Sequence, residues 1–496
     1  MHEFVTSFKL LVPLAITGAA PFLILALRKN ENAREAASFI AALLAFASMM
    51  ALVPGVLNGK VYVYTLFTLI PGITVKLAAD GLSLIFGSIA TFLWFLATSY
   101  NIGYMRSLKE HAQSRYYFCF AVAIFGAVGV ALAGNILTLY LFYEIISVFT
   151  YPLVAHHQDQ SAYEGARKYM VYLMGTSKLF LLPAMVMTFV LAGTLDFNLA
   201  DVEHGIFPPD ANPLAVQITY ALYIAGLAKA ALMPLHNWLP SAMVAPTPVS
   251  ALLHAMAVVK AGVFSVCRIM LSGFGLDTLT NLNLGIPTAY VAAFTIVAAS
   301  MIAMTKDDLK ARLAYSTISQ LSYVVIGVAM LTPIAVQGGV LHIANHAFSK
   351  ITLFFGAGAI YVGSHLKSID RLSGLGRKMP WTFGAFGVAT LSMIGLPPAC
   401  GFVSKWFLVN GAAEIEHPWL LAALLTSTLL NAFYFGQILY KAYIEKPHPE
   451  VDFNHVHEAP FTMVAPLVIT AAISLVIGVY PEPFLQFIKV LSLESP

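Results

Sequence analysis

The chain has 496 residues, of which 59% are hydrophobic and only 10% are charged, and its formal net charge is +3. Soluble domains carry about 25% charged residues, so this composition excludes a soluble globular protein and predicts an all-α protein that crosses a membrane many times. The positive charge is small and dispersed, so we expect no nucleic-acid partner.

A membrane-spanning helix needs about 20 predominantly apolar residues. Allowing for two interrupted segments, the sequence predicts about fourteen spans. They lie at about residues 8–27, 35–56, 78–101, 115–133, 135–156, 166–193, 213–237, 247–271, 285–304, 312–331, 336–362, 381–413, 418–442 and 461–489. The first run ends in Arg28 and Lys29 without a small-residue cleavage site, so we expect a retained helix rather than a signal peptide.

The distribution of basic residues predicts the orientation of the chain. Most of the 27 Lys and Arg residues fall in one alternate set of loops, and the other set, with the two termini, holds few of them. These few are Lys9, Lys60, Lys76, Arg268 and Lys489. By the positive-inside rule we expect the basic loops in the cytoplasm and both termini on the outer face of a prokaryotic cytoplasmic membrane.

Ionisable side chains inside the apolar runs are the most informative feature. They are Glu144, Lys178, Lys229, Lys260, Lys350 and Lys405. Each lysine facing lipid at the bilayer centre would cost about 2.5–3.5 kcal/mol, so we expect all of these side chains to face the interior of the bundle. A row of intramembrane ionisable residues indicates a proton or ion pathway.

Two features suggest an internal duplication. The sequence around Lys178 resembles that around Lys350, and the separation of these lysines nearly equals that of Lys229 and Lys405. We therefore divide the chain into helices 1–3, two five-helix units and a last helix. Their bounds are 1–110, 111–275 (spans 4–8), 276–446 (spans 9–13) and 447–496. Because five is odd, the second unit would be inverted relative to the first.

Proline interrupts the seventh and twelfth spans, one in each unit. Pro234 breaks the first of these, and Pro397 and Pro398 break the second. Non-helical backbone at membrane depth is tolerated only when it is buried in protein or lines a watery cavity, and matched breaks in two halves indicate an ion path. A packing kink is the alternative interpretation, and the lysine beside each break favours the ion path.

Proton transfer explains the choice of residue types. Desolvation lowers the pKa of a lysine side chain by up to about 3–5 units, whereas a nearby carboxylate keeps the ammonium charged. A Glu–Lys pair whose separation changes can therefore load and release a proton, and Glu144 is the only acid in the middle of a span. A static ion pair is the alternative for Glu144.

Histidines extend the pattern. His342, His346 and Lys350 follow one another at four-residue steps, on one stripe of a helix, and His254 shares the eighth span with Lys260. Histidine titrates near neutral pH and relays protons there, although a hydrogen-bonded core histidine is the alternative for each. Haem binding is disfavoured, because two axial ligands must face each other across helices, whereas His342 and His346 lie on one helix. His156 and His157 are expected at an interfacial helix end.

Small polar side chains add hydroxyl groups and an amide that can order water between the titratable groups, although packing between helices explains each of them alone. They are Ser177, Thr247, Ser250, Ser316, Thr317, Ser319, Gln320, Ser322, Ser349 and Ser404. Asp80 is expected to be structural. Cys119, Cys267 and Cys400 fall in different spans without the spacing of metal ligands, so they give no sign of a disulfide framework, a zinc site or an iron–sulfur cluster. We expect no metal, no cofactor and no catalytic residue in this chain, and any cofactors in partner subunits.

The motifs resemble a known family. Gly226–Lys229, Leu235–Pro240 and Ala245–His254 closely resemble the signature of the antiporter-like subunits of respiratory complex I and its relatives, the multisubunit (Mrp-type) cation/proton antiporters and the membrane-bound hydrogenases. Asn345–Lys350 and Gly401–Lys405 match further motifs of that family. The similarity covers about residues 75–445. The chain ends soon after span 14, so it resembles the shorter members.

The resemblance implies two inverted five-helix bundles and a hydrated polar axis at mid-membrane. By position, Glu144 matches the family's acid of span 5, and Lys229 and Lys405 match the lysines of the broken spans 7 and 12. Lys260 matches the linking lysine of span 8, and His346 and Lys350 match the relay of span 11. His254 matches a histidine that some members have. Lys178 matches no constant family position, so its role rests on the internal repeat alone.

The function that the resemblance implies is ion translocation, of protons or sodium, within a larger complex. Expected partners are other membrane subunits, including antiporter-like homologues, a peripheral redox arm and the lipid bilayer. A redox-driven pump, a cation/proton antiporter and an inorganic-carbon uptake system stay open, and so does whether the complex is an enzyme. The alternative from another class is a membrane-embedded enzyme acting on a quinone or lipid, which the spread of the titratable groups along the chain disfavours.

Overall fold

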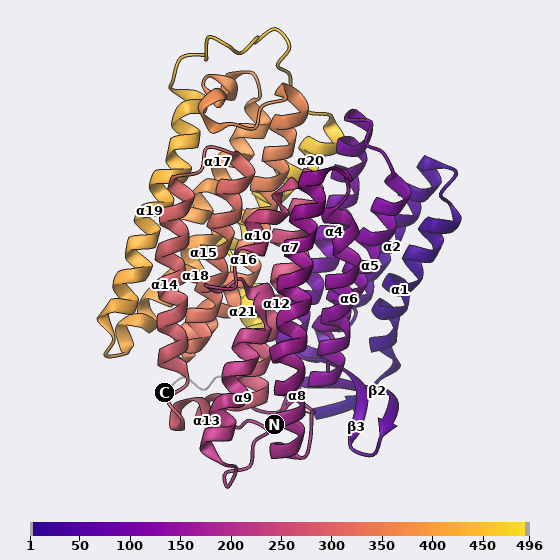
Figure 1. The fold of residues 1–496 in the computed structure, drawn as a ribbon, viewed down its shortest axis with the longest axis vertical. Helices are drawn as coiled ribbons and strands as arrows, with labels where there is room; N and C mark the ends of the chain where they lie inside the picture. Colours follow the sequence, from indigo (N-terminus) through magenta and orange to yellow (C-terminus); the bar gives the residue numbers. More distant parts are fainter. Residues whose placement is uncertain (1–2, 492–496) are drawn as a thin grey trace.

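The computed structural model describes residues 3–491 as a bundle of helices aligned with the long axis of the molecule (Figure 1). Eleven helical runs in this part of the chain are long and apolar enough to cross a membrane. The prediction of an all-α polytopic membrane protein is therefore confirmed in class. The count of about fourteen spans, the four-part division and the inverted repeat stay predictions.

The elements follow the chain in three groups. The first contains β1 (Glu3–Thr6), α1 (Leu11–Ala26), α2 (Glu31–Met50), α3 (Val53–Leu57), β2 (Lys60–Ile70), β3 (Ile73–Ala79) and α4 (Gly81–Ser107). The second contains α5 (Gln113–Ala131), α6 (Ile136–Val154), α7 (Gln160–Thr176), α8 (Leu182–Ala192), α9 (Pro213–Gly226), α10 (Trp238–Ser241), α11 (Thr247–Ala251), α12 (Val258–Arg268) and α13 (Gly275–Asn281). The third contains α14 (Gly285–Met304), α15 (Leu309–Ala329), α16 (Pro333–Ser364), α17 (Pro380–Ile394), α18 (Cys400–Glu414), α19 (Pro418–Tyr443), α20 (Phe461–Val479) and α21 (Glu482–Lys489).

Three spans predicted from the sequence, 213–237, 312–331 and 381–413, are not among the eleven apolar runs. The first and third are broken: α9 ends at Gly226, well before Pro234, and α17 and α18 are separated by residues 395–399. The second corresponds to α15, a continuous helix with many buried serines and threonines. Both breaks expected from proline are therefore present.

Many helices begin at a polar residue that caps free backbone N–H groups. The Asp80 and Asn135 side chains accept hydrogen bonds from the third residue of α4 and of α6, and Asp308 and Thr332 do the same at α15 and α16. Such a cap contributes about 1 kcal/mol. The caps mark where the chain enters each helix, and the apolar runs that follow determine how far it continues.

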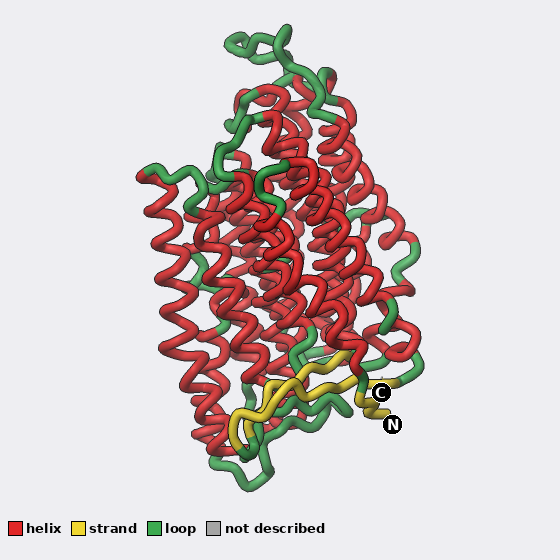
Figure 2. Tube along the Cα trace, turned by 90° about the vertical axis from the view of Figure 1, so that its right-hand side faces the viewer, coloured by secondary structure: helices red, strands yellow, loops and turns green. Residues whose placement is uncertain are grey.

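A small sheet that the sequence analysis did not predict closes one end of the bundle (Figure 2). β2 and β3 form an antiparallel hairpin that turns at Pro71 and Gly72, and β1 pairs with β2 in parallel. Gly72 has a φ of 84°, in the left-handed region that glycine adopts without strain. Within the described residues, the β-strands are therefore confined to residues 3–6, 60–70 and 73–79.

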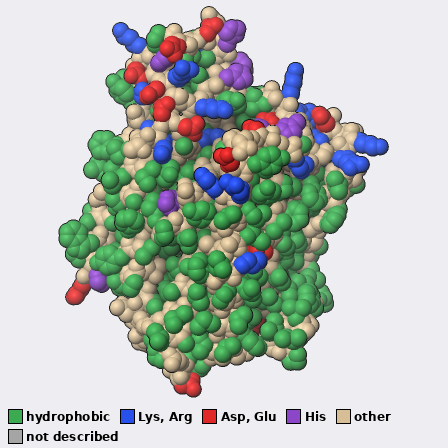
Figure 3. Space-filling view, in the orientation of Figure 1, with side chains coloured by type: hydrophobic (Ala, Val, Ile, Leu, Met, Phe, Trp, Pro, Cys, Tyr) green, Lys and Arg blue, Asp and Glu red, His purple; other side chains and the backbone are tan. Residues whose placement is uncertain are grey.

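Charged side chains gather mainly at the end of the bundle opposite this sheet, and a broad apolar belt lies between the two ends (Figures 1 and 3). We call the charged end, which carries loops 108–112, 155–159, 305–308 and 365–379, the basic end. The apolar belt has the composition that a lipid bilayer requires.

Asp80 and Arg268 form a buried ion pair between α4 and α12. The Arg268 guanidinium donates to both carboxylate oxygens of Asp80, over 2.6 and 2.7 Å, and a further bond goes to Ser83. The prediction that Arg268 is an outward-facing loop residue is therefore wrong, because Asp80 draws its side chain into the protein, where it is 1% exposed. Asp80 is structural, as expected.

Replacing Arg268 with alanine should destabilise the protein by about 3–5 kcal/mol, because the Asp80 carboxylate would stay buried without its partner. The measurement is the unfolding temperature of the purified protein in detergent. The control is Glu482→Gln, which removes the exposed Lys489–Glu482 pair and should change little. Equal effects of the two variants would contradict the structural role of the buried pair.

Candidate functional site

Most of the ionisable residues predicted at membrane depth lie inside the protein. Lys229, Lys260 and Lys350 are 0% exposed, and Lys405 is 6% exposed. His254, His342 and His346 are equally buried. We call these seven residues, together with Glu144, the polar row. The prediction of inward-facing lysines is confirmed for these four.

Lys178 departs from the prediction. Its side chain is 46% exposed on the lateral surface of the bundle, near the middle of the helical run Gln160–Ala192. Its Nζ donates to Glu144 Oε2 over 2.7 Å and to the Tyr140 hydroxyl over 2.6 Å. The two acceptors on α6 hold the ammonium at the surface, so the expectation that Lys178 faces the interior is wrong.

Glu144 faces in two directions. One carboxylate oxygen binds Lys178, and the other, Oε1, is buried without a hydrogen-bond partner among the described residues. Lys178 lies in a π-helical turn, Ser177–Leu181, between α7 and α8. Single π-helical turns are frequent at functional sites. Because its two oxygens have different surroundings, Glu144 joins the lateral surface to the interior.

Lys229 lies in a single 3-10 turn, Ala228–Ala230, within the broken segment that follows α9, and it contacts α6. Its Nζ donates to the Tyr143 carbonyl over 2.8 Å and to Ser147 Oγ over 2.7 Å, and it lies 3.1 Å from the centre of the Tyr143 ring. Tyr143 precedes Glu144 in the chain. The first acid and the first buried lysine of the polar row are therefore held by one turn of α6.

α12 packs directly on the backbone of the broken segment. A Cβ at Gly262 would lie 2.4 Å from both Ala230 N and the Lys229 carbonyl carbon. Only glycine permits this approach, which brings the helix that carries Lys260 against the segment that carries Lys229.

The middle of the polar row consists of direct side-chain contacts. Lys260 Nζ lies 2.6 Å from His346 Nδ1, and the rings of His346 and His342 have centroids 6.1 Å apart. His342 then contacts Ser404 Oγ at 2.8 Å and Gln320 Oε1 at 3.1 Å. These contacts connect α12, α16, α15 and α18 across the centre of the protein.

Lys350 and His254 lie beside this middle segment. Lys350 Nζ donates to Ser316 Oγ of α15. His254 lies in a second π-helical turn, Leu252–Met256, with its ring 4.6 Å from that of Phe354. Neither ring nitrogen of His254 has a hydrogen-bond partner among the described residues. Such buried nitrogens are available to exchange a proton with water.

Lys405 lies beside the second helix break. Its Nζ donates to the carbonyls of Met393, over 2.8 Å, and Ile394, over 3.1 Å, at the end of α17. The Asn345 amide donates to the Cys400 carbonyl on the other side of the break, over 2.7 Å. The lysine therefore satisfies backbone oxygens that the interrupted helix leaves free.

Several contacts of the site were not foreseen from the sequence. Tyr140, the Tyr143 carbonyl and Ser147 hold the lysines near Glu144, and the two π-helical turns lack a proline or glycine signal. Of the hydroxyl and amide groups that were singled out, Ser316, Gln320 and Ser404 contact the polar row directly. The four-residue spacing of α6 would have placed Tyr140 on the face of Glu144.

A cavity of about 530 Å³ opens at the basic end. Glu110, His157, Thr247 and Lys310 are among its lining residues. Partial burial opposes ionisation of Glu110, but the nearby imidazoles of His156, His157 and His111 outweigh it, so the pKa of the carboxyl lies below its usual value. Thr247 begins the helical run that contains His254, about 10 Å further along the axis.

Buried lysines and histidines aligned inside a polytopic helical bundle define a membrane protein organised around an internal polar row. The chain belongs to the NADH:quinone oxidoreductase/Mrp antiporter transmembrane family, whose profile matches residues 133–431. The resemblance found in the motifs is thus confirmed.

Curated relatives cover most of the chain. It is 31% identical over 493 residues to NADH-quinone oxidoreductase subunit N of Desulforudis audaxviator, covering 96% of each protein. It is 32% identical over 469 residues to a probable K(+)/H(+) antiporter subunit of Rhizobium meliloti, covering 90% of this chain and 44% of that protein.

Solved structures show the same fold. A chain of the membrane-bound sulfane sulfur reductase, an archaeal respiratory membrane complex, superposes with a TM-score of 0.86 at 26% identity, covering 98% of this chain and 97% of that one. A chain of the Mrp complex from Dietzia sp. DQ12-45-1b also gives a TM-score of 0.86, at 20% identity, covering 98% of this chain and 96% of that one. These relatives are subunits of multisubunit membrane complexes.

Gly262→Ala should destabilise the protein by about 1–3 kcal/mol, because the added methyl group meets backbone atoms that cannot move aside independently. The unfolding temperature in detergent measures this. Gly384→Ala in α17 is the matched control, since a Cβ there meets nothing within 4 Å. If the two variants unfold at the same temperature, the close packing of α12 on the Lys229 segment is not required.

Proposed function

We propose that this chain is the proton-translocating subunit of a multisubunit membrane complex. The observation that carries the proposal is the state of the four buried lysines: none has a carboxylate ion-pair partner among the described residues, and their contacts are to hydroxyls, carbonyls and a histidine. Buried charges in static roles are normally paired with an opposite charge. Unpaired buried lysines suit a path that takes up and releases protons.

The contacts arrange the path in three segments. The first is Glu144 of α6 with Lys229, which contacts α6; the second runs from Lys260 through His346 to His342 and Ser404; and the third is Lys405. Ordered water bridging polar groups would join one segment to the next. A proton loaded near Glu144 would then move sideways through the protein, parallel to the membrane.

The cavity at the basic end provides the route by which protons reach the row. It is polar, it opens among charged loops, and the helical run that starts at its Thr247 leads to His254. By the positive-inside rule the basic end lies in the cytoplasm of a prokaryotic cell, and both termini lie on the outer face of its cytoplasmic membrane. Protons would enter from the cytoplasm.

Other subunits would supply the energy. The polar row holds acid–base groups alone, so redox cofactors, where the complex uses them, would lie in partner subunits. Relatives include both quinone oxidoreductase and cation/proton antiporter subunits, so either a redox reaction or the exchange of a cation would drive proton transport. Sodium is the alternative to the proton as the translocated ion. An inorganic-carbon uptake system is a third setting for such a subunit.

An enzymatic role in quinone or lipid chemistry is less well supported. A reaction centre gathers its acid and base around one pocket. None of the residues of the polar row lines the cavity at the basic end, and the row is spread over helices across the bundle.

Glu144→Gln should reduce proton transport by the reconstituted complex at least about tenfold, because the amide keeps the shape of the side chain but cannot bind a proton. Acidification of vesicles, followed with a pH-sensitive dye, provides the measurement. The control is Glu164→Gln at an exposed position of α7. Full transport by a correctly assembled Glu144→Gln complex would exclude Glu144 from the path.

Lys229→Ala and Lys405→Ala should each block transport, and Lys→Arg at the same positions should restore little of it. Arginine reaches the same carbonyl and hydroxyl acceptors but stays protonated at physiological pH. Transport by the four variants distinguishes a proton-releasing lysine from a fixed charge. Near-normal transport by either arginine variant would show that this lysine acts as a fixed charge.

A further inference from the structure

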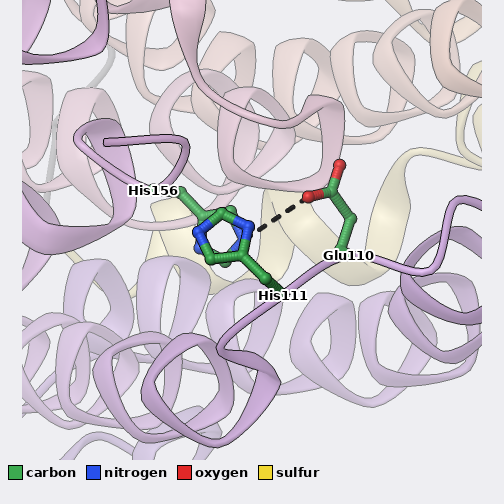
Figure 4. Close-up of side chains that lie close together, drawn as sticks. All are labelled: Glu110, His111 and His156. Atoms are coloured by element: carbon green, nitrogen blue, oxygen red, sulfur yellow. Dashed lines mark ion pairs between the residues drawn. The ribbon is translucent and has the colours of Figure 1, made fainter. Parts of the chain in front are cut away.

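Two loops at the basic end bring together side chains that the polar row does not use (Figure 4). Glu110 and His111 lie in the loop between α4 and α5, and His156 follows α6. A carboxylate oxygen and a nitrogen from each imidazole all lie within 4.8 Å of one another. We call these three residues the Glu110 cluster.

The distances in the cluster are close to those around a bound metal ion. Glu110 Oε2 lies 3.6 Å from His156 Nε2, and the rings of His111 and His156 have centroids 4.7 Å apart. Zn²⁺ holds imidazole nitrogen and carboxylate oxygen at about 2.0–2.2 Å, so two ligands of a tetrahedral ion are roughly 3.3–3.5 Å apart. Small side-chain rotations would bring all three ligand atoms to an ion between them.

His156 provides an independent indication of a ligand. Its side chain is 0% exposed, and neither ring nitrogen has a hydrogen-bond partner among the described residues. Buried polar atoms in folded proteins nearly always have such a partner. Figure 4 shows the Glu110 carboxylate directed at this ring, with the His111 ring over it.

The loops that carry the cluster are fixed by neighbouring groups. Arg115 donates to the His156 carbonyl over 3.0 Å, and the Gln113 side chain donates to the Glu110 carbonyl over 3.2 Å. The Glu110 N–H bonds the Met105 carbonyl over 3.0 Å. The backbone at Glu110 and His156 is thus fixed by contacts that leave the side-chain ligand atoms available to an ion.

We propose that Glu110, His111 and His156 bind a divalent transition-metal ion of the zinc class. Two imidazoles and one carboxylate are a ligand set that suits zinc and its neighbours rather than magnesium or calcium. His157 Nδ1, 3.8 Å from Glu110 Oε2, or water takes the fourth position. His111 is exposed, so an ion reaches the site from the aqueous side.

A second group in the described part of the chain has the same spacing and serves as a comparison. Asp201, Glu203 and His204 also place ligand atoms within 4.8 Å of one another. This group offers one imidazole, which already pairs with Asp201 at 2.5 Å, and it is exposed in a single loop. It lacks a buried unpartnered ligand and carries no proposal.

Binding at the Glu110 cluster has a consequence that rests on the proposed function. Glu110 and His157 line the cavity at the basic end. A metal ion bound there is ligated by the Glu110 carboxylate, which lines the cavity, and it places positive charge on the route of incoming protons. Zinc added on the side of the basic end should therefore inhibit proton transport.

The test of binding uses the purified complex and Zn²⁺ in competition with a chromophoric chelator. Wild type and His204→Ala should bind Zn²⁺ equally, whereas His111→Ala and His156→Ala should bind it at least about tenfold more weakly. Because His111 is exposed, its variant keeps the test valid if His156→Ala fails to fold. Co²⁺ in place of Zn²⁺ should give the visible absorption of a nitrogen- and oxygen-ligated ion, which His111→Ala abolishes. Unchanged binding in His111→Ala, or loss in His204→Ala instead, overturns the proposed site.

The test of inhibition uses the same complexes in vesicles with the basic end facing outward. Zn²⁺ should inhibit proton transport by wild type and His204→Ala, and inhibition of His111→Ala should require at least about ten times more Zn²⁺. Equal inhibition of wild type and His111→Ala overturns the link between the site and the cavity. A wild-type complex that binds Zn²⁺ but transports no protons contradicts the proposed function and leaves the metal site standing.

Discussion

A polar group that faces lipid has no water to bind, and the interior of this protein is arranged around that constraint. Two helices are interrupted in the bundle, and each interruption leaves backbone carbonyls without helical partners. Trp238 donates a hydrogen bond to the Ala228 carbonyl at the first break, and Lys405 and Asn345 donate to backbone carbonyls at the second. At the second break, Lys405, a side chain proposed to move protons, therefore also stabilises the broken backbone.

The two ends of the polar row differ in their charge. At one end Glu144 stands beside two lysines, one of them on the lateral surface, and the carboxylate has a free buried oxygen. At the other end Lys405 contacts two carbonyl oxygens and, among the residues that the structure describes, forms no ion pair with an acid. A carboxylate strengthens the hold on a proton, and carbonyl dipoles do so less. The row is therefore asymmetric in charge, with a carboxylate at one end and only backbone carbonyls around the lysine at the other.

The sequence predicted those features that depend on local composition. Apolar runs indicate where the helices lie, and proline at 234 and 397–398 lies within the two breaks, although α9 already ends at Gly226. The burial of Lys229, Lys260, Lys350 and Lys405 followed from the cost of a charge in lipid. The hairpin was missed, although Pro71-Gly72 between β-branched and aromatic residues indicates a turn between strands.

Features that depend on contacts between residues far apart in the chain could not be predicted from the sequence. Lys178 was placed inside because its own helix is apolar, and the Glu144 and Tyr140 partners that keep it at the surface lie on α6. Arg268 was assigned to a loop because Asp80 is far away in the chain. Glu110 and His156 likewise come together only when α4, α5 and α6 pack.

The exposed ammonium of Lys178 affects how the bilayer packs against this side of the protein. A charged head on a lateral surface draws water and lipid head groups toward it and thins the bilayer around it. A neighbouring protein that covers this surface removes the distortion. This side of the bundle is therefore less compatible with lipid than the apolar belt around it.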